Sequence, residues 1–169
     1  MRSVTLAPHP ASPPGPIDTL TVLLDRVGEA LWLRFVVEGR TRDVVWPEPA
    51  TPTRADDLWR HSCFEAFVQA EDGYVEYNLS PSGQWASYRF DRPRQGMRNA
   101  VVVATPPLLN VAQGRLAVEA RLELPTGARR IGLSAVIESV DGTFCYWALA
   151  HPSDNPDFHH PDSFILDLP

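Results

Sequence analysis

The residues of this chain that could do chemistry gather in two stretches, and the C-terminal stretch is the richer in ligating groups. Its imidazole and carboxylate side chains are His151, Asp154, Asp157, His159, His160 and Asp162. Such groups bind zinc and other transition metals, so the stretch could supply a metal site. Adjacent His159 and His160 point in opposite directions along an extended segment, so at most one of them could serve a given site. The favoured alternative is that these histidines hydrogen-bond to the backbone of a loop.

The second stretch combines aromatic residues with one carboxyl group. Trp59 precedes Glu65 by six residues, and Glu65 lies among Phe64, Ala66 and Phe67 in an apolar segment. A buried carboxyl group is costly, so Glu65 lies either on a solvated sheet face or toward a ligand. Side chains alternate along a strand, so Glu65 faces away from the layer into which Phe64 packs. If that layer is the core, Glu65 is free for a ligand.

The common enzyme signatures are missing from the sequence. It contains no nucleophile elbow, phosphate loop, dinucleotide fingerprint, zinc-protease helix or Cys-x-x-Cys pair. We therefore expect binding in preference to catalysis, and no catalytic residue is assigned. An enzyme of unrecognised type that uses His61, Glu65 and His160 is the third hypothesis for function.

The elements that must position these residues are predicted to be strands. Apolar and charged or small residues alternate clearly over residues 116–124, and less regularly over 20–24, 31–37, 64–68, 75–79, 101–103, 131–137 and 144–148. Seventeen prolines and many glycine-containing turns separate the segments and leave no room for a long helix. The pattern predicts an all-β antiparallel sandwich with at least nine strands in residues 20–168. One helical turn is expected at residues 53–61, after a surface connection that begins at Trp46.

Length and composition favour one packed domain. The chain has 169 residues, of which 44% are hydrophobic and 21% charged, so residues 17–169 are expected to form a single core after a Pro-rich segment, 1–16. The net charge of -6 argues against a nucleic-acid partner. The first 16 residues contain no apolar run typical of a signal peptide or membrane span, so we expect a cytoplasmic location.

Two further groups of residues have a structural and a functional interpretation. Cys63 and Cys145 lie in apolar strand-like segments and are expected to be buried, reduced thiols, with a disulfide as the alternative. Four arginines surround Asp91 and Pro93 in a polar loop: Arg89, Arg92, Arg94 and Arg98. A solvated loop is the favoured interpretation, and a site for an anionic ligand is the alternative.

Parts of the sequence resemble a known group of β domains. The segments that carry the resemblance are residues 57–68 with Trp59 and Glu65, residues 77–83, residues 147–152, and a closing part with Asn155, Phe158, Pro161 and residues 164–168. They resemble the family 9 carbohydrate-binding modules and the related DOMON-like domains. The resemblance implies a jelly-roll-like fold of two packed sheets. It also implies a carbohydrate or sugar-like small molecule as the ligand.

In the sugar-binding members two aromatic rings sandwich a sugar unit while Glu and Asn side chains hold its hydroxyls. The resemblance assigns the ring positions to Trp59 and Phe158 and the polar positions to Glu65 and Asn155. We expect these four residues to converge at one end of the sandwich, from residues 46–65 and 151–162. Further candidates for ligand contact are His61, Asn78, Trp85 and His160, although core packing is the favoured interpretation for Trp59 and Trp85.

The resemblance leaves the cofactor open. Some DOMON domains bind haem through Met and His, and the analogous residues here would be Met97 with His151 or His61. Met97 lies in a polar loop, residues 94–99. A haem-binding or metal-binding redox module is therefore the second hypothesis, after a non-catalytic binder of a sugar-like molecule.

Overall fold

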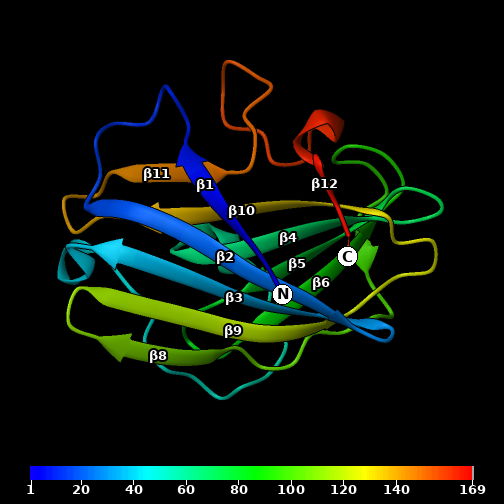
Figure 1. Cartoon of the computed structure of the whole chain (residues 1–169), viewed down its shortest axis with the longest axis horizontal. Coiled ribbons are helices and arrows are strands. Elements are labelled where there is room, and N and C mark those ends of the chain that lie inside the picture. Colours follow the sequence, from blue (N-terminus) through cyan, green and yellow to red (C-terminus); the bar gives the residue numbers. More distant parts are fainter. Residues whose placement is uncertain (169) are drawn as a thin grey trace.

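The computed structural model describes residues 1–168 and contains twelve strands within them (Figure 1). The strands are β1 (Arg2–Pro8), β2 (Ile17–Val27), β3 (Ala30–Gly39), β4 (Cys63–Gln69), β5 (Tyr74–Leu79), β6 (Trp85–Phe90), β7 (Arg98–Asn99), β8 (Leu108–Ala112), β9 (Arg115–Glu123), β10 (Arg130–Glu138), β11 (Phe144–Ala148) and β12 (Leu166–Asp167). Three single-turn 3-10 helices accompany them: η1 (Thr41–Asp43), η2 (Leu58–Arg60) and η3 (Pro161–Ser163). Over this range, no helix has the length and apolar character needed to cross a membrane.

The strands form one continuous, curled antiparallel sheet. Its order is β7-β6-β5-β4-β10-β11-β1-β2-β3-β9-β8, and β12 pairs with β10. Strand β1 joins the two halves, because residues 2–6 pair with β2 while Ala7 and Pro8 pair with β11. The predicted antiparallel all-β class is confirmed, as are at least nine strands and no long helix. The prediction of two separate packed sheets is not confirmed, since the sheet is continuous through β1.

A single main core fills the inside of the curl. Strands β2, β3 and β9 contribute residues such as Leu20, Leu33 and Val118, and β4, β5 and β10 contribute residues such as Phe64 and Leu133. Contact between the halves is direct, since the rings of Phe35 and Phe64 lie 5.0 Å apart. The apolar residues that alternate over residues 116–124 all face this core.

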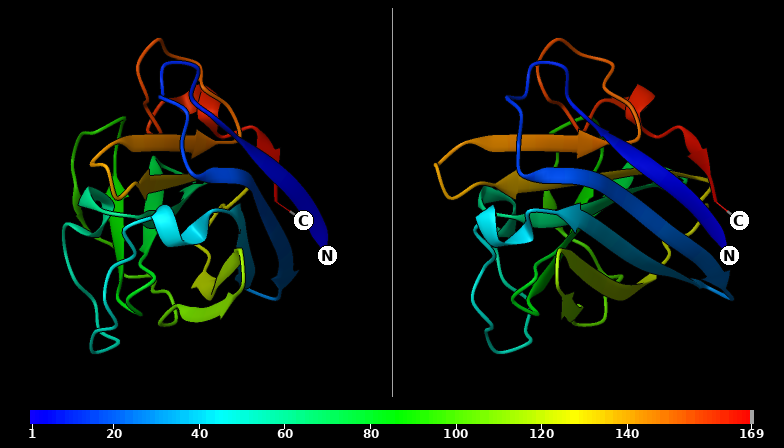
Figure 2. Two further views of the ribbon diagram at one scale, coloured as in Figure 1. Left: turned by 90° about the vertical axis from the view of Figure 1, so that its left-hand side faces the viewer. Right: turned by 60° about the vertical axis from the view of Figure 1, so that its left-hand side comes forward.

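A second apolar layer lies on the opposite side of β4, β5 and β6. We call the side of strands β4, β5, β6, β10 and β11 that faces away from the main core the outer face. Its buried aromatic residues are Phe67, Tyr74, Tyr88 and Phe90, and Phe164 packs onto them from the C-terminal segment. Figure 2 shows residues 149–165, in orange to red, lying on the far side of β10 and β11 from β9. Strands β4 and β5 are consequently buried on both faces, and the outer-face positions of β5 include the polar residues Glu76 and Asn78.

Local structure departs from the sequence predictions in three places. Residues 101–103, predicted as a strand, are not one. They lie in the connection between β7 and β8, just before Pro106 and Pro107, and the nearby pairing is limited to an isolated bridge from Ala104 to Leu122. The Pro-rich segment contains strand β1, which was not expected. The helical turn expected over residues 53–61 is reduced to η2.

Both cysteines are free and buried, as predicted. Cys63 and Cys145 are 0% and 2% exposed, respectively. They lie on different faces of the sheet: Cys145 belongs to the main core, whereas Cys63 shares the outer face with Glu65 because side chains alternate along β4.

Candidate functional site

A cavity of about 630 Å³ opens over the outer face of the sheet. Its walls come from η2, β4, β5, β6, β10, β11, the loop between β6 and β7, and the C-terminal segment. The lining residues are Trp59, Arg60, Glu65, Glu76, Phe90, Arg94, Met97, Val136, Phe144, Tyr146, Pro156, Phe158 and His159. This volume lies within the range of small-molecule sites. The cavity thus lies across a sheet face, and it uses parts of both segments from which the site was expected.

Strand register places two carboxyl groups together in this cavity. Phe64 and Ala66 belong to the main core, so Glu65 points to the outer face, as predicted. Glu65 pairs directly with Asn78 of β5 and with Ser134 of β10. Glu76, two residues before Asn78, is the diagonal neighbour of Glu65 on the same face. Adjacent strands therefore bring the two glutamates into one small volume.

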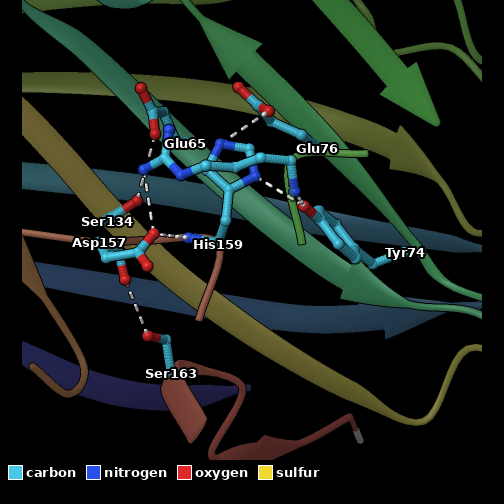
Figure 3. A network of polar contacts seen from close by, with 8 residues as sticks. Glu65, Tyr74, Glu76, Ser134, Asp157, His159 and Ser163 are labelled. Atoms are coloured by element: carbon cyan, nitrogen blue, oxygen red, sulfur yellow. Dashed lines mark hydrogen bonds and ion pairs between the residues drawn. The ribbon is translucent and has the colours of Figure 1, made fainter. Parts of the chain in front are cut away.

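The Glu76 carboxylate lies beside a hydrogen-bonded pair, Tyr74 and His159 (Figure 3). The backbone N–H of Arg94 donates to Tyr74 Oη at 3.2 Å, and Tyr74 Oη lies 2.7 Å from His159 Nδ1. His159 Nε2 faces Glu76 Oε2 at 3.6 Å, beyond hydrogen-bond distance, while Asn78 Nδ2 donates to Glu76 Oε1 at 3.0 Å.

Glu65 has far fewer partners. Its side chain is 3% exposed, and in the described part of the chain its hydrogen bonding is limited to Ser134 Oγ, 3.5 Å from Oε2. Within residues 1–168, Oε1 has no donor. Burial, together with the nearby charge of Glu76, raises the pKa of Glu65 well above its ordinary value. Burial therefore favours the neutral acid form of Glu65.

The other two titratable groups inside the cavity are also shifted by burial. Burial raises the pKa of Glu76 to about 7, although the hydrogen bond from Asn78 and the charge of Arg94 act in the opposite direction. Burial lowers the pKa of His159 to about 4, and the charge of Arg94 adds to that shift. Near neutral pH, His159 is uncharged and Glu76 is close to half ionised. Such perturbed groups in a cleft are typical of functional sites.

Two arginines border the cavity, and both have acidic partners. Arg94 Nη2 bonds Asp157 Oδ1 at 3.0 Å, and the same oxygen accepts the backbone N–H of His159 at 3.1 Å. Arg60 Nε bonds Asp57 Oδ1 at 3.1 Å. Pairing offsets the positive charge at the mouth, so the cavity is not an evident anion site.

Aromatic rings form the apolar part of the walls. Trp59 is 45% exposed, and the guanidinium of Arg60 lies 4.9 Å from its ring centroid. Phe158 is edge-on to Tyr146, with centroids 6.1 Å apart, and it also contacts Phe67 of the outer face. Rings from η2, β11 and the C-terminal segment thus surround the buried carboxyl groups.

The resemblance assigns four residues to ligand contact, and the structure places three of them in one cavity. Trp59, Glu65 and Phe158 line it, whereas Asn155 is exposed on the C-terminal loop and does not. Asn78 is completely buried next to Glu76, and its Oδ1 has no hydrogen-bond partner among residues 1–168.

The remaining predicted contact residues lie elsewhere. Trp85 pairs with core residue Leu79 and packs against the main core, so it is on the wrong side of the sheet for this cavity. His61 Nδ1 bonds Glu138 at 2.8 Å with the side chain 65% exposed. His160 caps η3 by accepting from the backbone N–H of Asp162. The expectation that adjacent His159 and His160 point apart agrees with these contacts.

The residues considered for metal or haem do not come together. Within residues 1–168, no three His, Cys, Asp or Glu side chains are grouped as metal ligands. Met97 lines the cavity, but neither His61 nor His151 does. His151 Nε2 instead bonds the carbonyl of Ala7 at 2.8 Å. The expected Met and His pair does not fit a haem site in this arrangement.

The sequence predictions did not include Glu76 or Tyr146; they considered Arg94 only for an anionic ligand, and His159 as a metal ligand or as a loop histidine bonded to the backbone. Glu76 could have been found, because the turn at residues 71–73 predicts a hairpin between residues 64–68 and 75–79. Alternation within that hairpin places Glu76 on the face of Asn78, opposite the core residue Tyr77. Arg94 and Tyr146 carry no comparable local signal, because tertiary packing alone brings them to the cavity.

Comparison with known proteins does not extend this description. No protein-family model matches the sequence, and no curated protein is significantly similar to it. Any function must therefore be argued from the cavity itself.

Proposed function

We propose that this protein is a binding module for a carbohydrate or sugar-like small molecule and that the outer-face cavity holds this ligand. The observation that carries the proposal is that Trp59, Phe158 and Glu65, which lie far apart in the sequence, line the same cavity. A molecule with an apolar face and several hydroxyl groups would match such walls.

Chemical complementarity supports this class of ligand. Sugar C–H faces pack on aromatic rings, which Trp59, Phe158 and Tyr146 present. Hydroxyl groups can donate to a carboxylate and accept from a carboxylic acid, and the pair of glutamates can supply both forms because burial raises the pKa of Glu65 and Glu76. The ligand would occupy space between the C-terminal segment and the sheet.

We also propose that the chain is a DOMON-like domain related to the family 9 modules. Support comes from the all-β antiparallel architecture and from the meeting of Trp59, Glu65 and Phe158. In this proposal the two halves of the curled sheet correspond to the two layers of a jelly-roll-like sandwich. Fold analogy alone names no ligand.

The proposal is tested by calorimetric titration with neutral hexoses, pentoses, polyols and disaccharides. Trp59 is partly exposed on η2, so Trp59→Ala should fold normally and lower the affinity for the best ligand at least about tenfold. Trp32→Ala is the matched control, because Trp32 lies on β3 and does not line the cavity. Equal losses in both variants, or saturable binding that Trp59→Ala leaves unchanged, would contradict the proposal.

A second candidate function is acid–base chemistry on a molecule bound in the same cavity. The observation that favours it is that two neighbouring carboxyl groups share one buried cavity and that burial raises the pKa of both, that of Glu76 to about 7. A carboxyl group whose pKa is raised toward neutrality is typical of a general acid or base. Turnover of a ligand found in the titrations would support catalysis if Glu65→Gln and Glu76→Gln each abolish it. A ligand recovered unchanged after long incubation would contradict it.

A further inference from the structure

We propose that the ligand of the outer-face cavity carries a protonated amine, so that an amino sugar or a comparable polyhydroxylated amine is preferred over its neutral parent. This inference rests on the proposed function and narrows its ligand class. It depends on three features of the cavity: its hydrogen-bond balance, the charges around it and its aromatic walls.

Carboxyl oxygens with distant or missing donors lie at the base of the cavity. Glu65 Oε1 has no donor in the described residues, and Ser134 approaches Oε2 only to 3.5 Å. Glu76 Oε2 lies 3.6 Å from His159 Nε2. Behind them, Asn78 Oδ1, on the residue directly opposite Glu65, is buried without a partner in residues 1–168, although Asn78 does not itself line the cavity. An ammonium group supplies three N–H donors and no acceptor, whereas each hydroxyl supplies one donor.

The charges around the two glutamates leave a negative balance for a cation to neutralise. The ionisable groups that surround them are Cys63 on β4, Tyr74 on β5, Tyr88 on β6, Glu138 on β10, Tyr146 on β11, Arg60 on η2, Arg94 in the loop after β6, and Asp157 and His159 in the C-terminal segment. The two cations among them, Arg60 and Arg94, are bonded to Asp57 and Asp157. When Glu65 and Glu76 ionise, their charge therefore has no dedicated partner inside the cavity.

The aromatic walls suit a cation as well as a sugar face. Phe90, Phe144, Tyr146, Phe158 and Trp59 all line the same space. The faces of such rings attract ammonium groups, and they do so more strongly where water is excluded. A buried carboxyl pair inside a ring-lined cavity thus combines the two features that recognise amines.

Binding of an amine should release a proton from the cavity, whereas binding of a neutral sugar should not. In the free protein burial favours the protonated forms of Glu65 and Glu76, and an ammonium placed beside them stabilises the ionised forms. The carboxyl pair would therefore release protons to solvent as the amine binds, while the amine keeps its own. The affinity for an amine should rise between pH 5 and pH 7 as Glu76 also ionises, because the amine remains protonated over that range.

The test compares glucosamine, galactosamine and mannosamine, each with its neutral parent sugar, by calorimetry at pH 6.5. We expect at least one amino sugar to bind about tenfold more tightly than its parent, or better. Repeating the titration in two buffers of different ionisation enthalpy should reveal a released proton for the amine and none for the parent. Glu65→Gln should reduce the preference to less than twofold, whereas Glu48→Gln, which alters an exposed loop carboxyl, should leave it unchanged.

The outcomes separate this inference from the proposed function. If amino sugars and parents bind equally, or binding releases no proton, the amine inference is overturned and sugar binding stands. If no member of any pair binds, the amine inference fails together with sugar binding for this class. A preference that Glu65→Gln leaves intact would place the amine away from the carboxyl pair and would also overturn the inference.

Discussion

Replacing Glu65 by glutamine separates the charge of this buried carboxyl group from its shape. Glutamine is nearly isosteric with the protonated acid, and it carries no titratable proton. The folded wild type holds Glu65 protonated because burial raises its pKa well above 4.5, the value expected for the unfolded chain. Comparing the free energy of unfolding of the variant with that of the wild type at several pH values therefore isolates the stability lost by keeping that proton.

The sign and size of the effect follow from linkage. Above pH 4.5 the unfolded chain releases the proton while the folded protein keeps it, so the wild type loses about 1.4 kcal/mol of stability per pH unit until the folded pKa is reached. Well below pH 4.5 the folded and the unfolded chain both bind the proton, and this loss is absent. The glutamine variant does not titrate at this position and avoids this loss.

Urea unfolding at pH 4, 5, 6 and 7 measures the difference in free energy of unfolding between the two proteins. We expect Glu65→Gln to gain stability relative to the wild type as the pH rises above 4.5, at up to about 1.4 kcal/mol per pH unit, until the folded pKa of Glu65 is reached. Any change in hydrogen bonding to the amide adds a constant that does not vary with pH, so the slope is the quantity to compare. Glu48→Gln, in an exposed loop, should stay within about 0.5 kcal/mol at every pH. A constant difference between Glu65→Gln and wild type would refute the reasoning.

Three further predictions concern packing and accessibility. Trp59→Ala should change the free energy of unfolding by less than about 1 kcal/mol, because the ring is half exposed, and a larger loss in urea melts would place Trp59 in the core. Phe67→Ala should cost about 3–5 kcal/mol, since the ring is buried and stacks on Phe164 at 6.0 Å; a loss below 1 kcal/mol would mean that the outer layer is not packed as described. Cys63 and Cys145 should react with a thiol reagent only after denaturation, and rapid labelling of the native protein would contradict their burial.

The predictable part of the fold is the part with strong local patterns. Residues 116–124 alternate cleanly and form β9 with the expected face inward, because one side of that strand is solvated over much of its length. Strand β1 was not predicted, because Pro8 and Pro10 suggested an irregular segment. Its pairing with both β2 and β11 is a long-range contact, and local propensity carries no information about such contacts.

The sequence predicts those features of the candidate site that follow from the alternation of side chains along a strand. The orientation of Glu65 follows from Phe64 facing the core, and both inferences hold. For Trp85 the favoured interpretation, core packing, is confirmed, and the alternative of ligand contact is wrong, because its pairing with Leu79 places it on the core side of β6. His159 reaches Glu76 only because the C-terminal segment lies across the outer face, and no sequence pattern specifies that path.

Amide chemical-shift mapping during titration with the best ligand is the most direct test of the central claim that the outer-face cavity is the ligand site. The account predicts that the largest changes occur at Trp59, Glu65, Phe158 and His159 and saturate together with the calorimetric signal. Changes centred on Trp46 and Leu109, which line a separate cavity, would contradict it.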